Sequence, residues 1–425
     1  MLPAVVGSTA ASSQYDSRMR SEALSHVRVL DLSRVLAGPW ASQVLADLGA
    51  EVIKVERPGV GDETRGWGPP WLDGGGTGPR TAAYFASTNR GKRSVTIDIS
   101  RPEGQAIVRR LALRADVLLE NYKVGALARY GLSYRDLAAE NPRLVYCSIS
   151  GFGQDGPYRD RPGYDFLIQA MGGLMSVTGE PDGAGGGGPV KVGVAVTDLL
   201  TGMYAATAVL AALAHRDRSG EGQHVDLSLL DVQVAALANQ AESFLVTGEP
   251  PRRLGNAHPS IVPYQAFATA DGHLVLAVGN DAQFARFCEV AGRPDLAGDP
   301  RFATNAGRVE ARAALVAVLA PLLASRTTGA WVSALEAADV PCGPINDLAQ
   351  VFADPQVRHR GLRVEIPRPG GGTVPAVASP IRLSRTPVCH DVPPPALGEH
   401  TREVLVGLLG MADGEVDELR SRGVV

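Results

Sequence analysis

Residues 27–56 read VRVLDLSRVLAGPWASQVLADLGAEVIKVE. Two apolar runs rich in β-branched residues, Val27–Leu32 and Val52–Glu56, flank a segment with helical spacing, Pro39–Leu48. Such runs favour strands, and proline is favoured at the first position of a helix. This stretch therefore predicts a strand, a helix and a second strand in succession, the unit from which parallel sheets are built.

The same alternation continues to residue 150. Further strands are predicted at Ser94–Ile99, Val117–Asn121 and Leu144–Ser150, with helices at Pro102–Ala115 and Ser133–Glu140. Alternating strands and helices favour a parallel sheet covered by helices on both faces. The sequence therefore predicts an α/β fold for the first part of the chain.

A second unit is expected after the sequence GEPPRR at 248–253, because prolines and glycine mark a boundary there. Asp271-Gly272 lies between two strand candidates and predicts a hairpin. Helices are expected near Gln283–Ala291, Val309–Ser325 and Ala330–Ala338, then strands near Thr373–Leu383 and a last helix at Thr401–Leu409. The Val-Val terminus is expected to be packed. We predict a disordered extension (1–26), a large domain (27–235), a linker with an active-site loop (236–260), a small domain (261–362) and a return to the large domain (363–425).

The composition is that of an ordinary globular protein. The 425 residues are 45% hydrophobic and 20% charged, with a formal net charge of −4. This charge argues against a broad electrostatic grip on nucleic acid or an anionic membrane. No stretch is expected to reach the length of a transmembrane helix. Four dispersed cysteines without CxxC spacing predict reduced thiols, no zinc or other metal site and a cytoplasmic protein. A mitochondrial presequence at 1–26 is a minor alternative, because this segment contains acidic residues, which such presequences disfavour.

The first strand–helix turn excludes one common cofactor. It reads SRVLAGP at 33–39 and lacks the GxGxxG pattern that lets a backbone approach a pyrophosphate. A nicotinamide or flavin enzyme is therefore not predicted. Arg57 follows the second strand at the carboxyl edge of the sheet, where open α/β sheets bind ligands. It is interpreted either as a ligand contact or as a solvated surface residue.

Asp198 is the one charged residue in the stretch from Val192 to Ala214. It stands where apolar alternation changes to a helical run, so it is interpreted either as a helix N-cap or as a carboxylate nucleophile kept ionised by the helix dipole. Burying an ionised carboxylate is costly unless something compensates for it. The local sequence alone favours the cap.

Several ordered blocks together resemble class III coenzyme A transferases, the family of formyl-CoA transferase, carnitine CoA-transferase and α-methylacyl-CoA racemase. The blocks cover nearly everything from His26 to Val425: they are Val29–Pro39, Leu48–Gly59, Asn89–Ser94, Asp116–Asn121 with Gly131-Leu132, Gly163–Asp165, Val196–Asp198 with Thr201-Gly202, and Val340–Pro344. Trp67–Pro70, Gly163–Phe166 and His258–Phe267 look most like the succinate–hydroxymethylglutarate (glutarate) CoA-transferase branch.

The resemblance implies a fold and a mechanism. It implies a Rossmann-like large domain built from both chain ends, a smaller α+β domain, and a homodimer of interlocked rings. Asp198 falls on the catalytic aspartate of the family, whose carboxylate attacks an acyl-CoA thioester and forms a mixed anhydride and then an aspartyl-CoA thioester. The implied substrates are coenzyme A thioesters, with succinyl-CoA as donor, and a small dicarboxylic acid such as glutarate.

The resemblance also assigns binding residues. Coenzyme A contacts map onto Leu36, Ala37, Arg57, Ile97, Asp98, Ile99, Ser100, Asn121, Tyr122, Lys123, Arg129, Pro162, Gly163, Tyr164 and Asp165. Arg57, Lys123 and Arg129 are the cationic candidates for the nucleotide end. Lys123 is equally interpreted as a surface lysine. The second carboxylate of an acceptor is expected to meet one of Arg34, Arg65, Arg252 and Arg253.

The chain departs from its relatives at three places. Leu36 stands where formyl-CoA transferase has Gln, which argues against an oxalate and formate site. The segment that matches the glycine-rich flap of that enzyme has one glycine, so a fixed substrate loop is expected. Its residues Gly255, Asn256, His258 and Ser260 are expected to act across the dimer, on the Asp198 of the other subunit. His258 is equally interpreted as a structural hydrogen-bonder. Tyr164 stands at the histidine of the racemase branch, and a phenol is a poor base for an α-proton. Racemase and non-catalytic CoA-binding protein remain the alternatives.

Overall fold

A computed structural model of the chain describes residues 22–72, 81–183, 187–369 and 371–425. It divides into two compact units. The first takes in the described residues up to Gly172, together with Gly193–Ala238 and Gln356–Val425, and the second consists of Gly173–Val192 and Asn239–Pro355. Both ends of the chain therefore contribute to the first unit. Residues 173–192, which the sequence analysis placed in the large domain, belong to the second unit instead.

The start of the chain is described only in part. Residues 1–21 of the predicted extension lie outside the described residues. Residues 22–26 form a turn, in which the Leu24 N–H donates to the Leu48 carbonyl over 2.9 Å. Leu24 also packs against the apolar core beside the first strand. This end of the predicted extension is thus part of the first unit.

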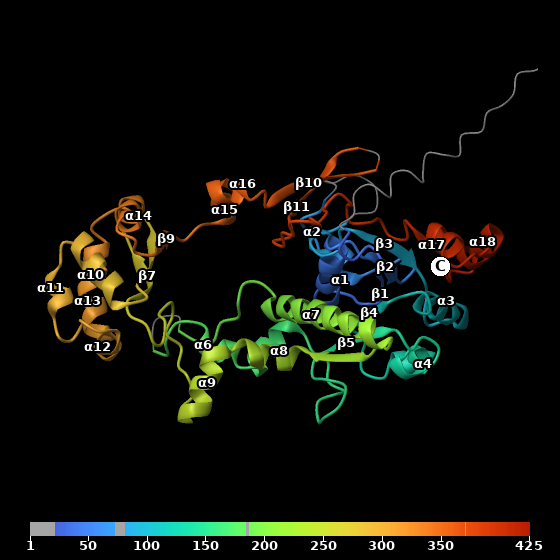
Figure 1. The fold of residues 1–425 in the computed structure, drawn as a ribbon, viewed down its shortest axis with the longest axis horizontal. Helices are drawn as coiled ribbons and strands as arrows, with labels where there is room; N and C mark the ends of the chain where they lie inside the picture. The colour runs from blue at the N-terminus through green and yellow to red at the C-terminus, as the bar shows by residue number, and fades with distance from the viewer. Residues whose placement is uncertain (1–21, 73–80, 184–186, 370) are drawn as a thin grey trace, which may run out of the picture. The chain divides into compact units, whose positions relative to one another are not determined.

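A six-stranded parallel sheet forms the centre of the first unit, in the order β3-β2-β1-β4-β5-β6 (Figure 1). Its strands are β1 (Arg28–Asp31), β2 (Glu51–Glu56), β3 (Lys92–Thr96), β4 (Val117–Glu120), β5 (Val145–Ser150) and β6 (His224–Ser228). The prediction of a parallel α/β sheet is confirmed, and five of these strands lie where the sequence placed them. The sixth, β6, was not predicted.

The strand order reverses at β1. This strand pairs on one side with β2, Val29 opposite Val52, and on the other with β4, Val29 opposite Val117. Consequently the loops that leave β1 and β4 diverge to opposite sides of the sheet and open a crevice at its carboxyl edge. Open α/β sheets bind their ligands at such a point.

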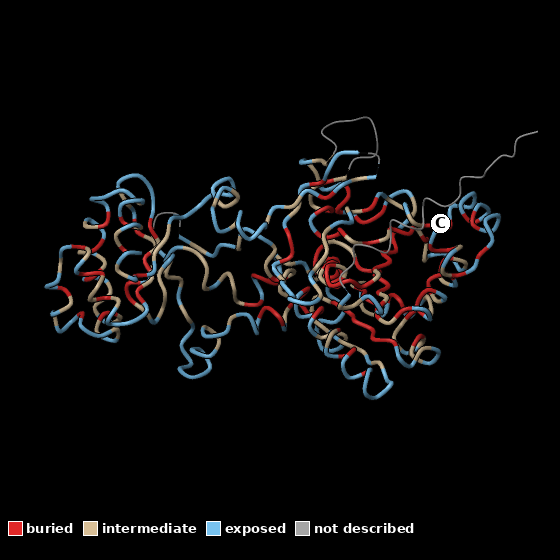
Figure 2. The backbone as a smooth tube through the Cα atoms, turned by 45° about the horizontal axis from the view of Figure 1, so that its top comes forward, coloured by how far each residue is buried: buried red, intermediate tan, exposed pale blue. Residues whose placement is uncertain are grey.

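Helices cover both faces of the sheet. One core joins alternate strand residues to α1 (Ala37–Asp47) and α7 (Val196–Ser219), and the other joins them to α3 (Pro102–Ala112), α17 (Thr401–Gly407) and α18 (Asp413–Ser421). In Figure 2 the buried segments gather in the interior of this unit. The terminal residues Val424 and Val425 are buried in the second of these cores, and the Val424 carbonyl accepts the Asp98 N–H over 2.8 Å. The expectation of a packed terminus is confirmed.

Helix α7 is long and apolar enough to cross a membrane by length and composition. The expectation that no segment reaches that length was therefore wrong. Its buried residues, among them Ala205 and Val209, pack in the core with α1 and the sheet. Within the described residues, α7 is thus built as the core helix of an α/β layer.

The second unit contains an antiparallel sheet of β7 (Tyr264–Ala268), β8 (His273–Ala277) and β9 (Cys342–Pro344). The predicted hairpin at Asp271-Gly272 is confirmed by the pairing of β7 with β8. The helices that close its core, around Phe284, Leu319 and Trp331, are α10 (Asp281–Val290), α11 (Asp295–Gly298), α12 (Asn305–Glu310), α13 (Arg312–Leu323) and α14 (Thr328–Ala337). The predicted helix Val309–Ser325 is in fact α12 and α13.

Shorter elements complete the two units. The first unit carries a hairpin of β10 (Arg363–Pro367) and β11 (Thr373–Val377), together with η1 (Glu63–Gly66), α2 (Ala83–Ala86), η2 (Leu127–Tyr130), α4 (Tyr134–Ala138), α5 (Asp165–Met171) and α8 (Leu229–Ala236). The second carries α6 (Leu174–Val177), most of α9 (Ala238–Thr247) and α15 (Leu348–Ala353), and α16 (Pro355–His359) leads back to the first.

Candidate active site

A cavity of about 300 Å³ opens at the carboxyl edge of the parallel sheet, where the strand order reverses. Its walls come from the loop after β1, the loop after β4, the end of β5, the segment 159–164 and the start of α7. Asp198 is the one carboxylate among the residues that line it. The cavity therefore combines the position expected of a ligand site in this fold with the acid that the sequence singled out.

Asp198 is the third residue of α7, which begins at Val196 after the N-cap Ala195. The interpretation of Asp198 as the N-cap was therefore wrong. Its backbone lies inside the first helical turn, so its side chain is released from capping. It lines the same cavity as Asn121, as the nucleophile hypothesis requires.

The start of α7 is capped by a different acid. Asp165, in the first turn of α5, accepts the backbone N–H of Thr197 over 2.8 Å and that of Asp198 over 3.3 Å at its Oδ1. Its Oδ2 accepts the Gln169 side-chain amide over 2.7 Å. The resemblance assigned Asp165 to coenzyme A, but Asp165 does not line the cavity and binds the N-terminus of α7. Its contacts are those of a helix-capping carboxylate.

Close backbone approaches hold these segments together. A Cβ on Gly202 would lie 2.7 Å from the Ala37 carbonyl oxygen, so only glycine lets α7 approach the first turn of α1 this closely. Gly151 and Gly163 approach each other in the same way, since a Cβ on either would lie within 2.6 Å of the other's Cα. The first approach places Asp198 beside the loop after β1. The second places the segment 162–165 over the end of β5.

The pKa of Asp198 is raised to about 7 by burial and, in addition, by the charge of Asp165. Asp165 occupies the N–H groups of Thr197 and Asp198, so these two helix donors are not free to stabilise the Asp198 carboxylate. Tyr84 in α2 responds to the same acids: burial, then the charges of Asp198, Asp165 and Asp62, raise the pKa of its hydroxyl. Near neutral pH, Asp198 is consequently divided between its acid and its carboxylate form.

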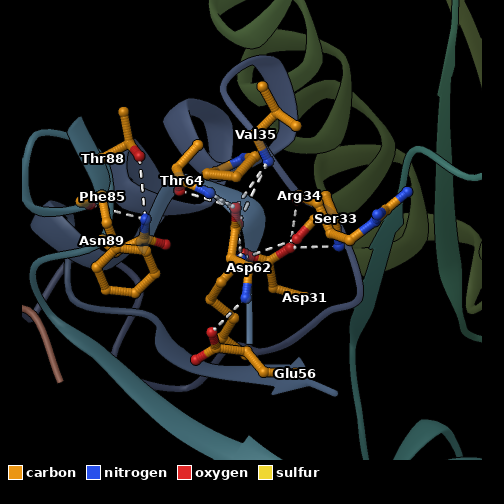
Figure 3. A network of polar contacts seen from close by, with 12 residues as sticks. Asp31, Ser33, Arg34, Val35, Glu56, Asp62, Thr64, Phe85, Thr88 and Asn89 are labelled. Atoms are coloured by element: carbon orange, nitrogen blue, oxygen red, sulfur yellow. Dashed lines mark hydrogen bonds and ion pairs between the residues drawn. The ribbon is translucent and has the colours of Figure 1, made fainter. Parts of the chain in front are cut away.

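The loop after β1 is strained. Val35 has a φ of 71°, in the left-handed region that β-branched residues avoid. The Asp62 carboxylate accepts the Val35 backbone N–H over 3.3 Å (Figure 3). The Asn121 side chain binds Arg34, the preceding residue: it accepts the Arg34 N–H over 2.9 Å and donates to the Arg34 carbonyl over 2.7 Å. These polar contacts hold the strained backbone in place. They direct Leu36 and Ala37 toward the cavity that Asp198 lines.

Two fully buried lysines, Lys54 and Lys92, bind residues in and next to this loop. The Lys54 ammonium lies 3.0 Å from the Asp62 carboxylate and donates to the Ser33 carbonyl over 2.8 Å. The Lys92 ammonium lies 3.3 Å from the Asp31 carboxylate. Burial alone would raise the pKa of Asp62 and lower that of Lys54. Their mutual attraction, with Asp31 and Glu56 also acting on Lys54 and Thr64 bonded to Asp62, reverses both directions, so the pKa of Asp62 falls and that of Lys54 rises. Burial lowers the pKa of Lys92 to about 7, although Asp31 opposes it.

Eight of the residues predicted to contact coenzyme A line the cavity with Asp198. They are Leu36, Ala37, Asn121, Tyr122, Lys123, Pro162, Gly163 and Tyr164. The others do not line it. Arg57 and Arg129 are exposed, Ile97 is buried in the sheet core, and Asp98 accepts the Ser100 N–H over 3.0 Å. Any role of Arg57, Arg129 and Ile97–Ser100 in binding therefore lies outside this cavity.

Sequence reasoning missed the two arginines of the segment 159–161. Arg159 and Arg161 both line the cavity, and the Arg161 guanidinium lies 4.5 Å from the centre of the Tyr158 ring. Together with Arg34 and Lys123 they give the cavity four cationic groups. The signal was present in the Arg-Asp-Arg sequence at 159–161, just before Pro162-Gly163. Val35, Val124, Ile149, Ser150, Gly151 and Leu229 complete the lining and were also missed.

Three of the arginines expected to read an acceptor carboxylate already have partners. Arg65 forms a bidentate pair with Glu56, at 2.7 Å for both contacts, and its guanidinium lies 3.7 Å from the centre of the Phe85 ring. Arg253 pairs with Asp182 in the second unit. Arg34 lines the cavity although it also pairs with Glu63. Arg34 thus lines the same cavity as Asp198.

The predicted substrate loop lies in the second unit, where its own contacts fix it. Gly255 donates its N–H to the Gly179 carbonyl over 3.0 Å, and the ring Nδ1 of His258 accepts the Ser260 N–H over 3.0 Å. The Arg312 guanidinium donates to the carbonyl of His258 over 2.8 Å. Asn256 is exposed. The Nδ1 of His258 is thus used within the loop, as the interpretation of His258 as a structural hydrogen-bonder expects.

A sequence model of CoA-transferase family III matches residues 24–401. The chain belongs to this family. It is 52% identical to a succinate–glutarate CoA-transferase of Agrobacterium fabrum. The match extends over 393 residues, 92% of this chain and 97% of that protein. It is 44% identical over 402 residues to the human succinyl-CoA:glutarate CoA-transferase, which covers 95% of this chain and 90% of that protein.

Solved structures agree with this assignment. A CaiB/BaiF family protein from Brucella suis superimposes with a TM-score of 0.80 at 48% identity, over 92% of this chain and 100% of that one. Rv3272 of Mycobacterium tuberculosis superimposes with a TM-score of 0.79 at 35% identity, over 90% of this chain and 99% of that one. The family III CoA-transferase described here therefore has the fold of these proteins.

Proposed function

We propose that this family III enzyme transfers coenzyme A from succinyl-CoA to a dicarboxylic acid of the glutarate type, through covalent intermediates on Asp198. The observation that carries the proposal is the half-buried Asp198 carboxyl, which lines a cavity bordered by four cationic side chains. The choice of substrates is supported by the named activities of relatives at 44% and 52% identity. Tyr164 lines the cavity at the position where the racemase branch has histidine, which favours transfer over racemisation.

The reaction needs a carboxylate nucleophile. An Asp198 oxygen attacks the thioester carbonyl of the donor, the C–S bond breaks, and a mixed anhydride and CoA thiolate result. The thiolate attacks the Asp198 acyl carbon, which releases the donor acid and leaves an aspartyl-CoA thioester. An acceptor carboxylate then attacks that thioester and forms a second anhydride and thiolate. Attack of the thiolate on the acceptor acyl carbon gives the new acyl-CoA and restores Asp198.

The cations of the cavity suit an anionic substrate. Arg159, Arg161, Lys123 and Arg34 surround its walls, and charge-assisted bonds to phosphate or carboxylate are stronger than neutral ones. We assign the acyl-pantetheine arm of coenzyme A to the cavity and its nucleotide end to Arg57, Arg129 and Ile97–Ser100 outside it. Arg34 is our candidate for the second carboxylate of the donor or acceptor acid.

We also propose that the enzyme acts as an interlocked homodimer in the cytoplasm. The first unit exposes large apolar side chains that a monomer would leave in water: Tyr164, Phe166, Leu167, Met171, Val194, Met203, Tyr204 and Val234. Exposed apolar surface on this scale is typical of a subunit interface. We assign the loop with Gly255, Asn256, His258 and Ser260 to the active site of the partner subunit.

An acceptor panel tests the substrate assignment. The purified enzyme is given succinyl-CoA and, one at a time, malonate, glutarate, malate, adipate, benzoate and butyrate, and the product thioesters are identified by mass spectrometry. We expect glutaryl-CoA as the main product, and no product from the Asp198→Ala variant. Transfer to a monocarboxylate with none to any dicarboxylate would contradict the assignment.

A further inference from the structure

The capping contact of Asp165 puts two acids at one helix end. Its Oδ1 accepts the N–H of Thr197 over 2.8 Å and that of Asp198 over 3.3 Å, and Gln169 fixes its other oxygen. The N-terminal donors of a helix are the groups that would best stabilise a carboxylate in the first turn. Asp165 takes them first. Among the described residues, no donor is hydrogen-bonded to the carboxylate of Asp198 itself.

The surrounding side chains keep Asp165 in this place. Thr197, the other residue it binds, is fully buried and donates its hydroxyl to Gln233 over 2.6 Å. Gln169 is also fully buried, and Asp165 does not line the cavity. A substrate in the cavity therefore meets Asp198, whereas Asp165 is not among the residues that line the cavity. The second acid acts on the first without touching the reacting atoms.

We propose that Asp165 is a positioning residue for the transfer reaction: it takes the helix donors and places a like charge beside Asp198, which leaves the Asp198 carboxylate weakly stabilised and therefore strongly nucleophilic. The inference rests on the proposed role of Asp198 as nucleophile. A carboxylate held by two helix N–H groups would be a weaker base and a poorer attacking group. Asp165 would thus set both the geometry and the reactivity of the acid in front of it.

Other titratable groups also face Asp198. Tyr84 approaches from α2, and its hydroxyl is influenced by the charges of Asp198 and Asp165. The cavity brings Arg34, Tyr122, Lys123, Arg159, Arg161 and Tyr164. The first turn of α1, which packs against α7, contributes no titratable side chain. Burial and the charge of Asp165 are the causes that raise the pKa of Asp198.

The substitution Asp165→Asn separates charge from capping. The asparagine oxygen still accepts the N–H groups of Thr197 and Asp198, so the helix end is retained while the negative charge is removed. We expect the acid limb of kcat/KM for succinyl-CoA to move to lower pH by roughly one unit, because kcat/KM reports the ionisation of the free enzyme. At pH 8 we expect a lower kcat than that of the wild type, since the carboxylate is less basic.

Asp231→Asn is the matched control. Asp231 is an exposed acid in the first turn of α8, in the same unit, and does not line the cavity. The acid limb of kcat/KM for succinyl-CoA in this variant should lie at the same pH as in the wild type. If Asp165→Asn does not fold by circular dichroism, Asp165→Ser carries the same prediction, because its hydroxyl oxygen also accepts a hydrogen bond and bears no charge.

The outcomes distinguish the inference from the proposed function. A downward shift in the Asp165 variant and none in the Asp231 variant supports the inference. An unshifted limb overturns it, and leaves the nucleophile assignment standing if Asp198→Ala is inactive. Transfer activity in Asp198→Ala would overturn both.

Discussion

At the scale of single residues, the proposed role of Asp198 requires an ionised carboxylate, whereas its surroundings favour the protonated form. In the proposed mechanism the carboxyl must be ionised to attack a thioester, yet it is half-buried beside a second acid, and its pKa is raised to about 7. A raised pKa means that the folded state holds the proton more tightly than the unfolded chain does. Ionisation of Asp198 therefore works against folding, as is common where function requires a destabilised group.

This conflict predicts a stability gain from removing the charge. Below the ordinary carboxyl pKa of about 3.9 both states are protonated, and the stability that the proton provides is lost as the pH rises through about 7. The Asp198→Asn variant should therefore have a higher Tm than the wild type at pH 8, and the difference should shrink as the pH falls from 7 toward 4. Differential scanning calorimetry across this range measures it. A variant that is less stable than the wild type at pH 8 would contradict the burial argument.

The sequence could predict Asp198 but not its surroundings. Asp198 is conspicuous because a lone acid interrupts a long uncharged stretch. Its helix cap comes from Asp165, 33 residues earlier in the chain, and no local pattern connects the two. The N-cap interpretation failed for this reason. Local sequence shows that an acid stands near a helix start, but only tertiary contacts show which acid binds the helix.

At the scale of elements, the loop after β1 depends on buried charges. Val35 is strained, and Asp62 and Asn121 hold its segment while Lys54 holds Asp62. The sequence predicted the strands and the helix around this loop, since their apolar spacing is local. Nothing in a valine indicates a left-handed backbone. That conformation depends on Asp62, just before η1, and Asn121, just after β4, which come together only in the folded state.

Removing the buried lysine should therefore be costly. Lys54→Met leaves the Asp62 carboxylate buried without its cation, which typically costs about 3–5 kcal/mol. Urea denaturation should show that loss in the free energy of unfolding. Arg422→Met is the control: Arg422 pairs with Glu103 at the surface, and such pairs contribute about 0–1 kcal/mol. Equal losses in the two variants would contradict the role assigned to the Lys54–Asp62 pair.

At the scale of the whole molecule, the first unit is closed by both ends of the chain. The sheet core receives Val404 and Leu405 from α17 and the terminal valines, so the first half of the chain cannot complete this core alone. The βαβ pattern predicted the α/β class because strands and helices alternate from residue 27 to residue 150. The sequence did not predict that residues 173–192 belong to the second unit, because nothing in that segment indicates which residues it packs against.

The proposed dimer predicts complementation between inactive chains. Asp198→Ala removes the nucleophile, and an Asn256→Ala/His258→Ala double variant removes the proposed substrate loop. If each site combines Asp198 of one subunit with the loop of the other, coexpressed chains form heterodimers with one intact site. Random pairing should then restore about a quarter of wild-type activity in the unpurified mixture, and about half in heterodimers isolated through both tags. Chains tagged differently and purified in tandem provide the sample, and light scattering gives its mass. Heterodimers without activity would show that the loop serves its own subunit or neither.

Covalent trapping on Asp198 is the most direct test of the central claim. The enzyme is incubated with succinyl-CoA without acceptor, treated with borohydride or hydroxylamine, and digested for peptide mass spectrometry. We predict that the reduced or hydroxamate product is found on the peptide containing Asp198, and is absent from the Asp198→Ala enzyme. A trapped adduct on any other residue of a protein that still transfers coenzyme A would contradict the mechanism.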